Sequence, residues 1–186
     1  RILVSTDIPN FETILEHLNR YNVSNIQVDF DCRDPAWCSD STKTDDLIVY
    51  ILKLLRTKYM LWTHVTSPFF NEHSYERFIY MFQDAGCNFD SAMSVNKIQD
   101  FLWDNTGPIN YDRTNQMWPP TQTLRPYFML NSAAFMVEVE QARHLKDRIG
   151  VKPYLYDTAP LEGLDVDWED QWELVKVLAT NGYDFT

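Results

Sequence analysis

The hydrophobic and polar positions of the chain follow two alternating patterns. Short apolar runs, typical of buried strands, are separated by longer segments whose apolar residues recur every three or four positions, as in helices. This alternation predicts an α/β sheet with helical connections. The strands expected in the first half are 1–5, 25–30, 59–65 and 89–95, and the expected helices are 5–22 (through Phe11, Ile14, Leu15 and Leu18), 45–57 and 71–86.

Two of these segments carry a further signal. The run at 59–65 is nearly all apolar, which indicates a strand covered on both faces. The helix at 71–86 ends in Gly86, and glycine readily adopts the left-handed backbone that closes many helices. We therefore expect a buried strand at the first segment and a sharp helix end at the second.

The alternation breaks between residues 96 and 127. Aromatic, proline and polar residues mix there without a helical period, which predicts a loop-and-hairpin excursion out of the sheet. The regular pattern returns as a strand at 127–139, a helix at 140–149 and a strand at 152–158. The sequence thus predicts one α/β domain over residues 1–186, with a Rossmann-like, doubly wound mixed sheet and a small excursion at 96–127.

Composition and charge narrow the functional classes. The 186 residues are 45% hydrophobic and 15% aromatic, which is typical of a folded globular domain. Sixteen basic and 27 acidic residues give a formal net charge of −11. Such a surface argues against non-specific binding of nucleic acid or anionic membranes, and an anionic substrate would need a local arginine, lysine or metal ion.

The cysteines and the ends of the chain indicate a compartment. Cys32, Cys38 and Cys87 lack the CxxC spacing of a zinc site and are too few for a disulfide framework, so we expect reduced thiols in a cytoplasmic protein. The sequence shows neither a signal peptide nor an apolar run long enough to span a bilayer. Arg1 opens directly on a strand pattern, so we expect an N-terminal piece to be missing.

A pair of aspartates near the C-terminal end is the first candidate site. Asp165 and Asp167 flank Val166, and in an extended backbone residues two apart share a face. Two carboxylates on one face repel each other unless a cation lies between them, and Mg²⁺ prefers such oxygen ligands. The alternative is structural, with Asp167 as the N-cap of the following helix and Asp165 as a loop acid.

The expected sheet edge supplies further polar residues. Ligands of open α/β sheets bind beyond the carboxyl ends of strands, where His64 and the hydroxyls of Thr66 and Ser67 follow the apolar run. The hydroxyl-rich loop at 31–44 precedes a helix and is suited to bind an anion or a base. Each of these segments is also compatible with an ordinary solvated turn.

Taken in order along the chain, these motifs resemble the CMP-sialic acid synthetases, also called acylneuraminate cytidylyltransferases. The resemblance covers nearly the whole chain. Its motifs are VSTD (4–7), RDPAWCSDSTKT (33–44), HVTSPF (64–69), FDSAMSV (89–95), RTNQMWPP (113–120), LNSAAFMV (130–137) and EGLDVDWEDQWEL (162–174).

The resemblance implies a fold of the nucleotide-diphospho-sugar transferase type and a reaction. CTP and a nine-carbon 2-keto sugar acid would give a CMP-sugar and pyrophosphate, with Mg²⁺ offsetting phosphate charge. It also implies a homodimer, with 96–127 as the dimerisation arm. By similarity, Asp165 and Asp167 would bind the metal and act in catalysis, Arg33 and Thr44 would bind the nucleotide, His64, Gln116, Asn131 and Phe135 would face the sugar, and Arg113 would reach the sugar carboxylate in the neighbouring subunit's site.

Three departures qualify the resemblance. The family's opening strand and its Gly/Lys/Arg-rich phosphate loop are absent from the sequence. His64 stands where the family usually has glutamine, and Ser132 and Phe135 replace a usual glycine and a common tyrosine. The sugar therefore stays open among sialic, legionaminic and pseudaminic acid types. A nucleotidyltransferase for another sugar or nucleotide, or a non-catalytic sugar-nucleotide-binding module, are the alternatives.

Overall fold

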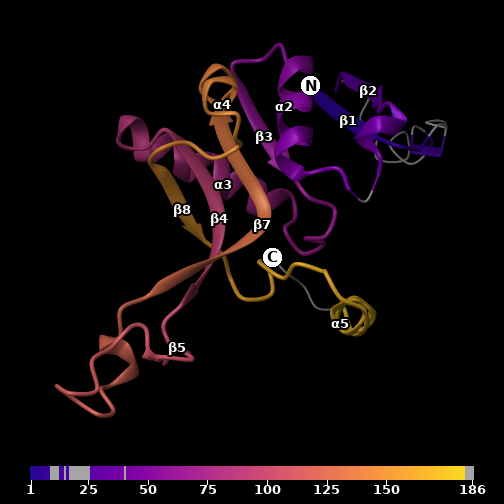
Figure 1. The fold of residues 1–186 in the computed structure, drawn as a ribbon. Helices are drawn as coiled ribbons and strands as arrows, with labels where there is room; N and C mark the ends of the chain where they lie inside the picture. Colours follow the sequence, from indigo (N-terminus) through magenta and orange to yellow (C-terminus); the bar gives the residue numbers. More distant parts are fainter. Residues whose placement is uncertain (9–12, 15, 17–25, 40, 183–186) are drawn as a thin grey trace. The chain divides into compact units, whose positions relative to one another are not determined.

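A computed structural model describes residues 1–8, 13–14, 16, 26–39 and 41–182 (Figure 1). The chain forms two compact units, Arg1–Arg56 and Thr57–Thr186. Most of the helix expected at 5–22, including Phe11, Leu15 and Leu18, lies outside the described residues. Within the described part of the chain, no helix combines the length and the apolar character needed to cross a membrane.

The first unit contains a pair of parallel strands and a helix. Strands β1 (Ile2–Thr6) and β2 (Val28–Cys32) pair with Ile2 opposite Val28, and both were expected from the apolar runs. A 3₁₀ turn, η1 (Pro35–Trp37), interrupts the loop that follows β2. Helix α2 (Thr44–Leu54) has acidic residues in its first turn, as the helix dipole favours, and it confirms the helix expected at 45–57.

The second unit is built on a four-stranded mixed sheet in the order β3-β7-β4-β8 (Figure 1). Strands β4 and β8 are parallel, and β7 runs antiparallel to both β3 and β4. Strand β7 therefore lies between β3 and β4, which both come well before it in the sequence. The bounds are β3 (Tyr59–Thr63), β4 (Ser91–Ile98), β7 (Tyr127–Glu138) and β8 (Pro153–Asp157).

Strand β3 differs from its expectation. Its burial alternates, with Met60 5% exposed but Tyr59 and Leu61 44% and 37% exposed. The prediction of a strand covered on both faces is therefore wrong. The physical reason is its place at the edge of the four-stranded sheet, where apolar composition alone does not show which face is covered.

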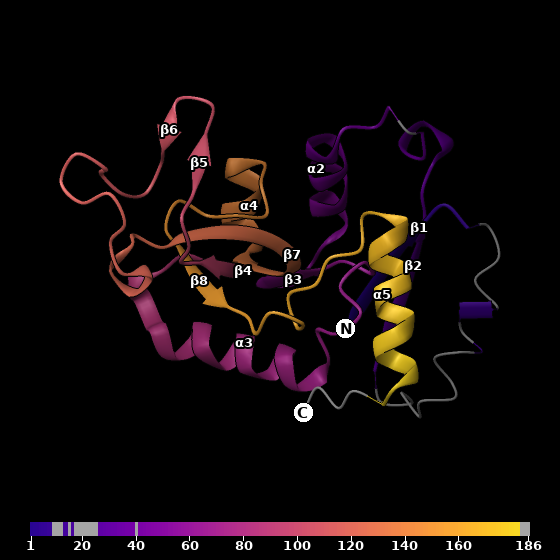
Figure 2. The ribbon, with the colours of Figure 1, turned by 90° about the horizontal axis from the view of Figure 1, so that it is seen from below.

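Helix α3 (Glu72–Ala85) lies along one face of this sheet (Figure 2). The Asn71 side chain caps its first turn by accepting a hydrogen bond from the Ser74 amide, and Gly86 closes it with φ +60°, as expected. Phe78, which is fully buried, joins the apolar core between the helix and the sheet. The short 3₁₀ turn η2 (Gly86–Asn88) then leads into β4.

Helix α4 (Val139–Leu145) is shorter than the expected 140–149. It ends because Lys146 takes the left-handed conformation, with φ +58°, and its amide bonds back to the Ala142 carbonyl. The residues after it, up to the start of β8, therefore form an irregular connection. This early ending places Arg148 outside the helix.

The excursion at 96–127 is present as a hairpin-bearing arm. Figures 1 and 2 show it projecting from the paired ends of β4 and β7. It contains β5 (Trp103–Asp104), β6 (Gly107–Pro108) and the 3₁₀ turn η3 (Thr121–Thr123). The expected loop-and-hairpin excursion is thus confirmed as a structural feature.

Strand β7 changes register against β4 near its middle. Phe135 pairs with Met93, whereas Leu130 pairs with Val95, so β7 carries extra residues at this point. Ser132 lies in the bulge with φ +60°, a conformation that favours glycine. Glycine at this position would therefore be free of the strain that the serine side chain adds.

Candidate functional site

The candidate site of the second unit centres on His64, directly after β3. Its Nε2 accepts hydrogen bonds from Trp62 Nε1 at 3.1 Å and from an Nη of Arg148 at 2.7 Å. Neither partner can accept in return, so Nε2 must be unprotonated and the ring proton lies on Nδ1. His64 is therefore a neutral imidazole that offers an N–H donor on its other side.

The charges around His64 support the neutral form. Burial and the Arg148 cation lower the pKa of His64, and the carboxylates of Asp165 and Asp167 oppose this shift. The two aspartates therefore lie near enough to act on the imidazole. His64 is therefore acted on by one cationic group and two anionic groups.

The Arg148 guanidinium lies over an aromatic ring. Its guanidinium carbon lies 4.1 Å from the Phe135 ring centroid and 5.5 Å from that of Trp62. Burial lowers the pKa of Arg148, and Asp147 opposes this shift. Among the described residues, no carboxylate forms an ion pair with this half-buried guanidinium.

Asp165 lies in an irregular segment between β8 and α5 (Glu169–Thr180). The Val166 amide donates to the Thr66 carbonyl at 2.9 Å, which fixes this segment to the loop after β3. The Asp165 Oδ1 atom is buried and has no hydrogen-bond partner in the described part of the chain. Asp167 is exposed. The segment is thus not the regular strand that the sequence suggested.

The capping alternative for Asp167 is also wrong. The N-cap of α5 is Trp168, and the Gln171 side-chain oxygen accepts from the Asp167 and Trp168 amides at 2.7 and 2.9 Å. Gln171 therefore satisfies the amides of the two residues that directly precede α5. The Asp167 carboxylate is left available for another role.

The donor set fits a hard divalent cation. Mg²⁺ is commonly held by one or two carboxylates, with waters and substrate phosphates completing its shell. The buried, unpartnered oxygen of Asp165 meets that requirement, and Asp167 adds a second carboxylate. Across the described residues, no three His, Cys, Asp or Glu side chains gather in an arrangement suited to a metal, so the protein alone supplies only a partial shell.

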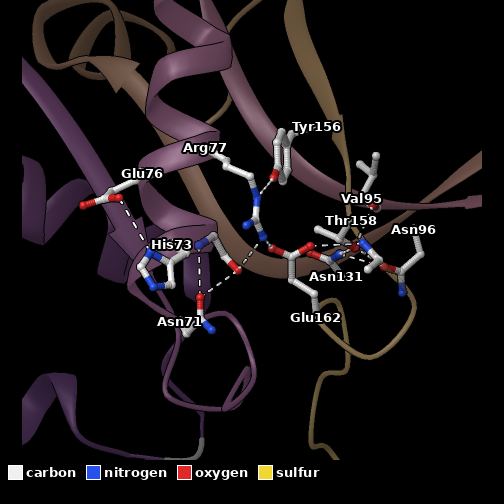
Figure 3. A network of polar contacts seen from close by, with 12 residues as sticks. Asn71, His73, Glu76, Arg77, Val95, Asn96, Asn131, Tyr156, Thr158 and Glu162 are labelled. Atoms are coloured by element: carbon white, nitrogen blue, oxygen red, sulfur yellow. Dashed lines mark hydrogen bonds and ion pairs between the residues drawn. The ribbon is translucent and has the colours of Figure 1, made fainter. Parts of the chain in front are cut away.

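Asn131 belongs to a different, closed polar network (Figure 3). Its amide nitrogen donates to Asn96 Oδ1 at 2.8 Å and to Thr158 Oγ1 at 2.9 Å, and the residue is 2% exposed. Thr158 Oγ1 donates in turn to Asn96 Oδ1 at 2.7 Å. The predicted contact between Asn131 and the sugar stays a prediction, since the described hydrogen bonds of Asn131 are internal.

The same network continues to α3 through Glu162. Arg77 donates to Glu162 Oε1 at 3.0 Å, and the Ala159 amide donates to Glu162 Oε2 at 3.1 Å (Figure 3). A side chain at Gly163 would meet Asn96 Oδ1 at 2.0 Å, so glycine is required there. The network therefore fixes the turn at 159–163, which leads directly into Asp165.

Arg113 and Gln116 lie on the excursion. The Arg113 guanidinium lies 5.3 Å from the Trp103 ring centroid and 5.6 Å from that of Trp118. Gln116 Nε2 donates to the Trp118 carbonyl at 3.5 Å. The described side-chain contacts of both residues are thus with the excursion itself, and their substrate roles stay predictions.

Arg33 and Thr44 belong to the first unit. Arg33 forms an ion pair with Asp7 at 3.6 Å, while its buried Nε has no hydrogen-bond partner among the described residues. Thr44 is the first residue of α2. On the same helix, a hydrogen bond to Asp31 and burial raise the pKa of Tyr50 to about 12. In this unit, Arg33 Nε is thus a buried cationic donor without a hydrogen-bond partner among the described residues.

Sequence reasoning missed Arg148 and Trp62. Arg148 falls in a stretch with helical spacing, so it reads as an exposed helix residue. The turn-forming Gly150 and Pro153 just after it are the signal that could have indicated an earlier helix end. Trp62 reads as core because it lies inside an apolar run.

Comparison with solved structures identifies the fold. No family model matches the sequence, and no curated protein matches it significantly. A 4-diphosphocytidyl-2C-methyl-D-erythritol synthase from Anaerococcus prevotii DSM 20548 superposes with a TM-score of 0.62 at 10% identity, covering 97% of this chain and 78% of its own. A CMP:2-keto-3-deoxy-manno-octonic acid synthetase complexed with CTP gives a TM-score of 0.55 at 12% identity, over 97% and 81%.

The chain shares the fold of these two synthetases. The predicted α/β class with a mixed sheet of the nucleotide-diphospho-sugar transferase type is therefore confirmed. Identities of 10% and 12% establish the fold alone, because one fold supports many chemistries. Function has to be argued from the site.

Proposed function

We propose that this protein is a nucleotidyltransferase that activates a nine-carbon, sialic-acid-like 2-keto sugar acid with CTP, giving a CMP-sugar and pyrophosphate. The proposal rests on two groups that act on His64: the buried carboxylate oxygen of Asp165, which has no hydrogen-bond partner among the described residues, and Arg148, which has no described carboxylate partner. A group suited to a cation and a group suited to an anion thus act on the same imidazole. A CTP-bound synthetase of a 2-keto sugar acid has the same fold.

The reaction is a displacement at phosphorus. In the ring form of the sugar acid, the hydroxyl on C2 gives its proton to water and forms a bond to the α-phosphorus of CTP, while the bond from that phosphorus to pyrophosphate breaks. When bound, Mg²⁺ would offset the negative charge of the phosphates. Asp165 and Asp167 would hold that ion, and their fixed position would spare reorganisation during the reaction.

His64 has a donating role in this proposal. Its Nε2 already accepts two hydrogen bonds, so it is a poor base, whereas its Nδ1–H can donate to an oxygen of the sugar acid. Phe135 would support the sugar pocket, together with Asn131 and Gln116. In the first unit, Arg33 and Thr44 would bind the nucleotide.

The excursion supports a homodimer. Its Trp103 and Trp118 side chains are 48% and 62% exposed, and Phe128, Met129 and Leu130 at the outer end of β7 are exposed as well. Contiguous exposed apolar residues favour a protein interface. Arg113 would then reach the neighbouring subunit's site. Light scattering of the intact protein is expected to give the mass of a dimer, and a monomer alone would contradict this part of the proposal.

The remaining partners follow from charge and chemistry. The net charge of −11 opposes binding to nucleic acid or anionic membranes. Use of CTP is consistent with a cytoplasmic location. A second candidate function, transfer to another acceptor, is favoured by the first structural neighbour, which is named for methylerythritol rather than for a sugar acid.

The test is pyrophosphate release by the intact protein. CTP, UTP, GTP or ATP is supplied with Mg²⁺ and with sialic, legionaminic, pseudaminic or 3-deoxy-manno-octulosonic acid, or methylerythritol phosphate. We expect release with CTP and a nine-carbon acid, and loss of release when EDTA is added. Release only with another pair would establish the second candidate. Binding without release under every condition would support a non-catalytic sugar-nucleotide-binding module and contradict both.

A further inference from the structure

We propose that Arg148 binds the carboxylate of the sugar acid from within the same chain. The inference rests on the proposed function for the identity of the ligand, but its geometric basis is independent. The guanidinium is half-buried, lies 4.1 Å from the Phe135 ring centroid and donates to His64 Nε2 at 2.7 Å. Arg148 is thus held in one orientation before any substrate arrives.

The donors of Arg148 are only partly used. A guanidinium has five N–H donors in a planar fork, and the contacts described for this side chain use one of them, on His64. Carboxylate is the group whose two oxygens best match the remaining fork. The ring of Phe135 covers one face of the cation, which leaves the edge of the fork for a ligand.

A contrast with Arg77 shows what is unusual here. Arg77, on α3, already pairs with Glu162 at 3.0 Å. Arg148 loses hydration on burial without gaining a carboxylate from the described residues. Burying an unpaired charge is costly. A bound anion that pairs with Arg148 would offset this cost.

The location suits the acid group of a 2-keto sugar acid. Arg148 bonds to His64, and the carboxylates of Asp165 and Asp167 act electrostatically on the same imidazole. The carboxylate of such a sugar is bonded to the carbon that carries the attacking hydroxyl. A carboxylate on Arg148 would therefore bring that hydroxyl close to His64, the imidazole on which both aspartates act. Arg113, on the excursion, would be a second and separate contact from the partner subunit.

The experiment measures binding of an acid against its neutral amide. Titration calorimetry with N-acetylneuraminic acid, 3-deoxy-manno-octulosonic acid and the primary amide of each is run on the intact protein in CTP and EDTA, so that binding is measured without turnover. For the tighter acid, we expect wild type to prefer acid over amide by about 10- to 100-fold, the range for hydrogen bonds to a charged partner. Arg148→Gln is expected to bind acid and amide alike, with CTP affinity unchanged.

Two further variants keep the result interpretable. Arg148→Lys retains the charge but loses the planar fork, so the preference should fall several-fold even if Arg148→Gln does not fold. Arg143→Gln, on α4 and paired with Glu140, is the matched control and should keep the wild-type preference. Thermal melting of each variant establishes that it is folded.

The outcomes separate this inference from the proposed function. An unchanged acid preference in folded Arg148→Gln overturns the role of Arg148, whether or not wild type releases pyrophosphate. So does a wild type that binds no acid more tightly than its amide. An Arg148-dependent preference without pyrophosphate release from any nucleotide upholds this inference while contradicting the proposed function.

Discussion

Two polar clusters of the second unit differ in how completely their hydrogen bonds are satisfied. The closed network around Asn131 and Glu162 uses its donors and acceptors internally, and it includes the Arg77–Glu162 ion pair. The open cluster around His64 contains an arginine and a buried aspartate oxygen that, among the residues the structure describes, have no carboxylate partner and no hydrogen bond, respectively. Each cluster contains one arginine. Arg77 of α3 belongs to the closed network, and Arg148 of the loop after α4 belongs to the open cluster.

We assign the closed network to the stability of the fold and the open cluster to the proposed function. Buried polar groups in native proteins are nearly always paired, so each unpaired one requires an explanation. The closed network holds the turn at 159–163 and thereby sets the position of Asp165. The open cluster departs from this pairing of buried groups at two places. In a substrate complex, a metal cation would pair with Asp165 and a substrate anion would pair with Arg148. Five predictions test this contrast.

The largest effect is expected at the metal-binding end of the open cluster. Asp165→Asn removes a carboxylate charge, so turnover should fall by roughly 10³-fold or more, while the melting temperature changes little. Pyrophosphate release and thermal melting measure the two quantities. Glu173→Gln, an exposed change on α5, is the control. Wild-type turnover in Asp165→Asn would remove the proposed metal role.

A loss of stability is expected from the closed network. Asn131→Ala deletes two side-chain hydrogen-bond donors and leaves buried oxygens of Asn96 and Thr158 with fewer partners, which should cost about 2–3 kcal/mol of unfolding free energy. Urea denaturation measures it, with exposed Asn181→Ala as the comparison. If Asn131→Ala kept wild-type stability yet lost sugar binding, Asn131 would belong with the open cluster.

The two arginines give a direct comparison. Arg77→Met leaves the mostly buried Glu162 carboxylate without its cation and should lower the unfolding free energy by about 1–2 kcal/mol. Arg148→Met should leave stability the same or slightly higher, because it removes an unpaired half-buried charge. Denaturant unfolding of both variants in parallel measures the difference. Equal losses would mean that Arg148 is as structural as Arg77.

A smaller gain is expected at the bulge of β7, beside Asn131. Ser132 has φ +60°, which is costly for a residue with a side chain. Ser132→Gly should therefore raise the unfolding free energy by about 0.5–1 kcal/mol, after the extra flexibility of glycine in the unfolded chain is subtracted. Ser132→Ala keeps the side chain carbon and should show no such gain. A loss in Ser132→Gly would show that the serine hydroxyl has a role of its own.

The smallest effect is a pH dependence in the open cluster. The folded protein lowers the pKa of His64 below 6.5, so the unfolded chain binds more protons just below that pH. The resulting stability is present above pH 6.5 and is lost as the pH falls through the folded pKa. Urea unfolding between pH 7.5 and 5.5 should show a weaker decline in His64→Gln, with exposed His144→Gln declining like wild type. An unchanged decline in His64→Gln would contradict the neutral imidazole.

The local features of the fold were determined by the sequence. The apolar pattern predicted the strands of the two main sheets, α2 and α3, and its interruption predicted the excursion, because each depends on residues within one short window. Gly86 ends α3 as expected, since its left-handed backbone is a local property. The Asp165–Asp167 pair could be recognised for the same reason, through its two-residue spacing.

Only the tertiary structure decided which residues meet. Arg148 contacts His64 across 84 positions of sequence, and the contact exists because α4 ends early and β7 runs beside β3. The exposed face of β3 and the internal bonding of Asn131 likewise follow from strand order and register. Pairings between distant strands depend on the free energy of the whole packed sheet rather than on the residues of one segment, so no local pattern contains them.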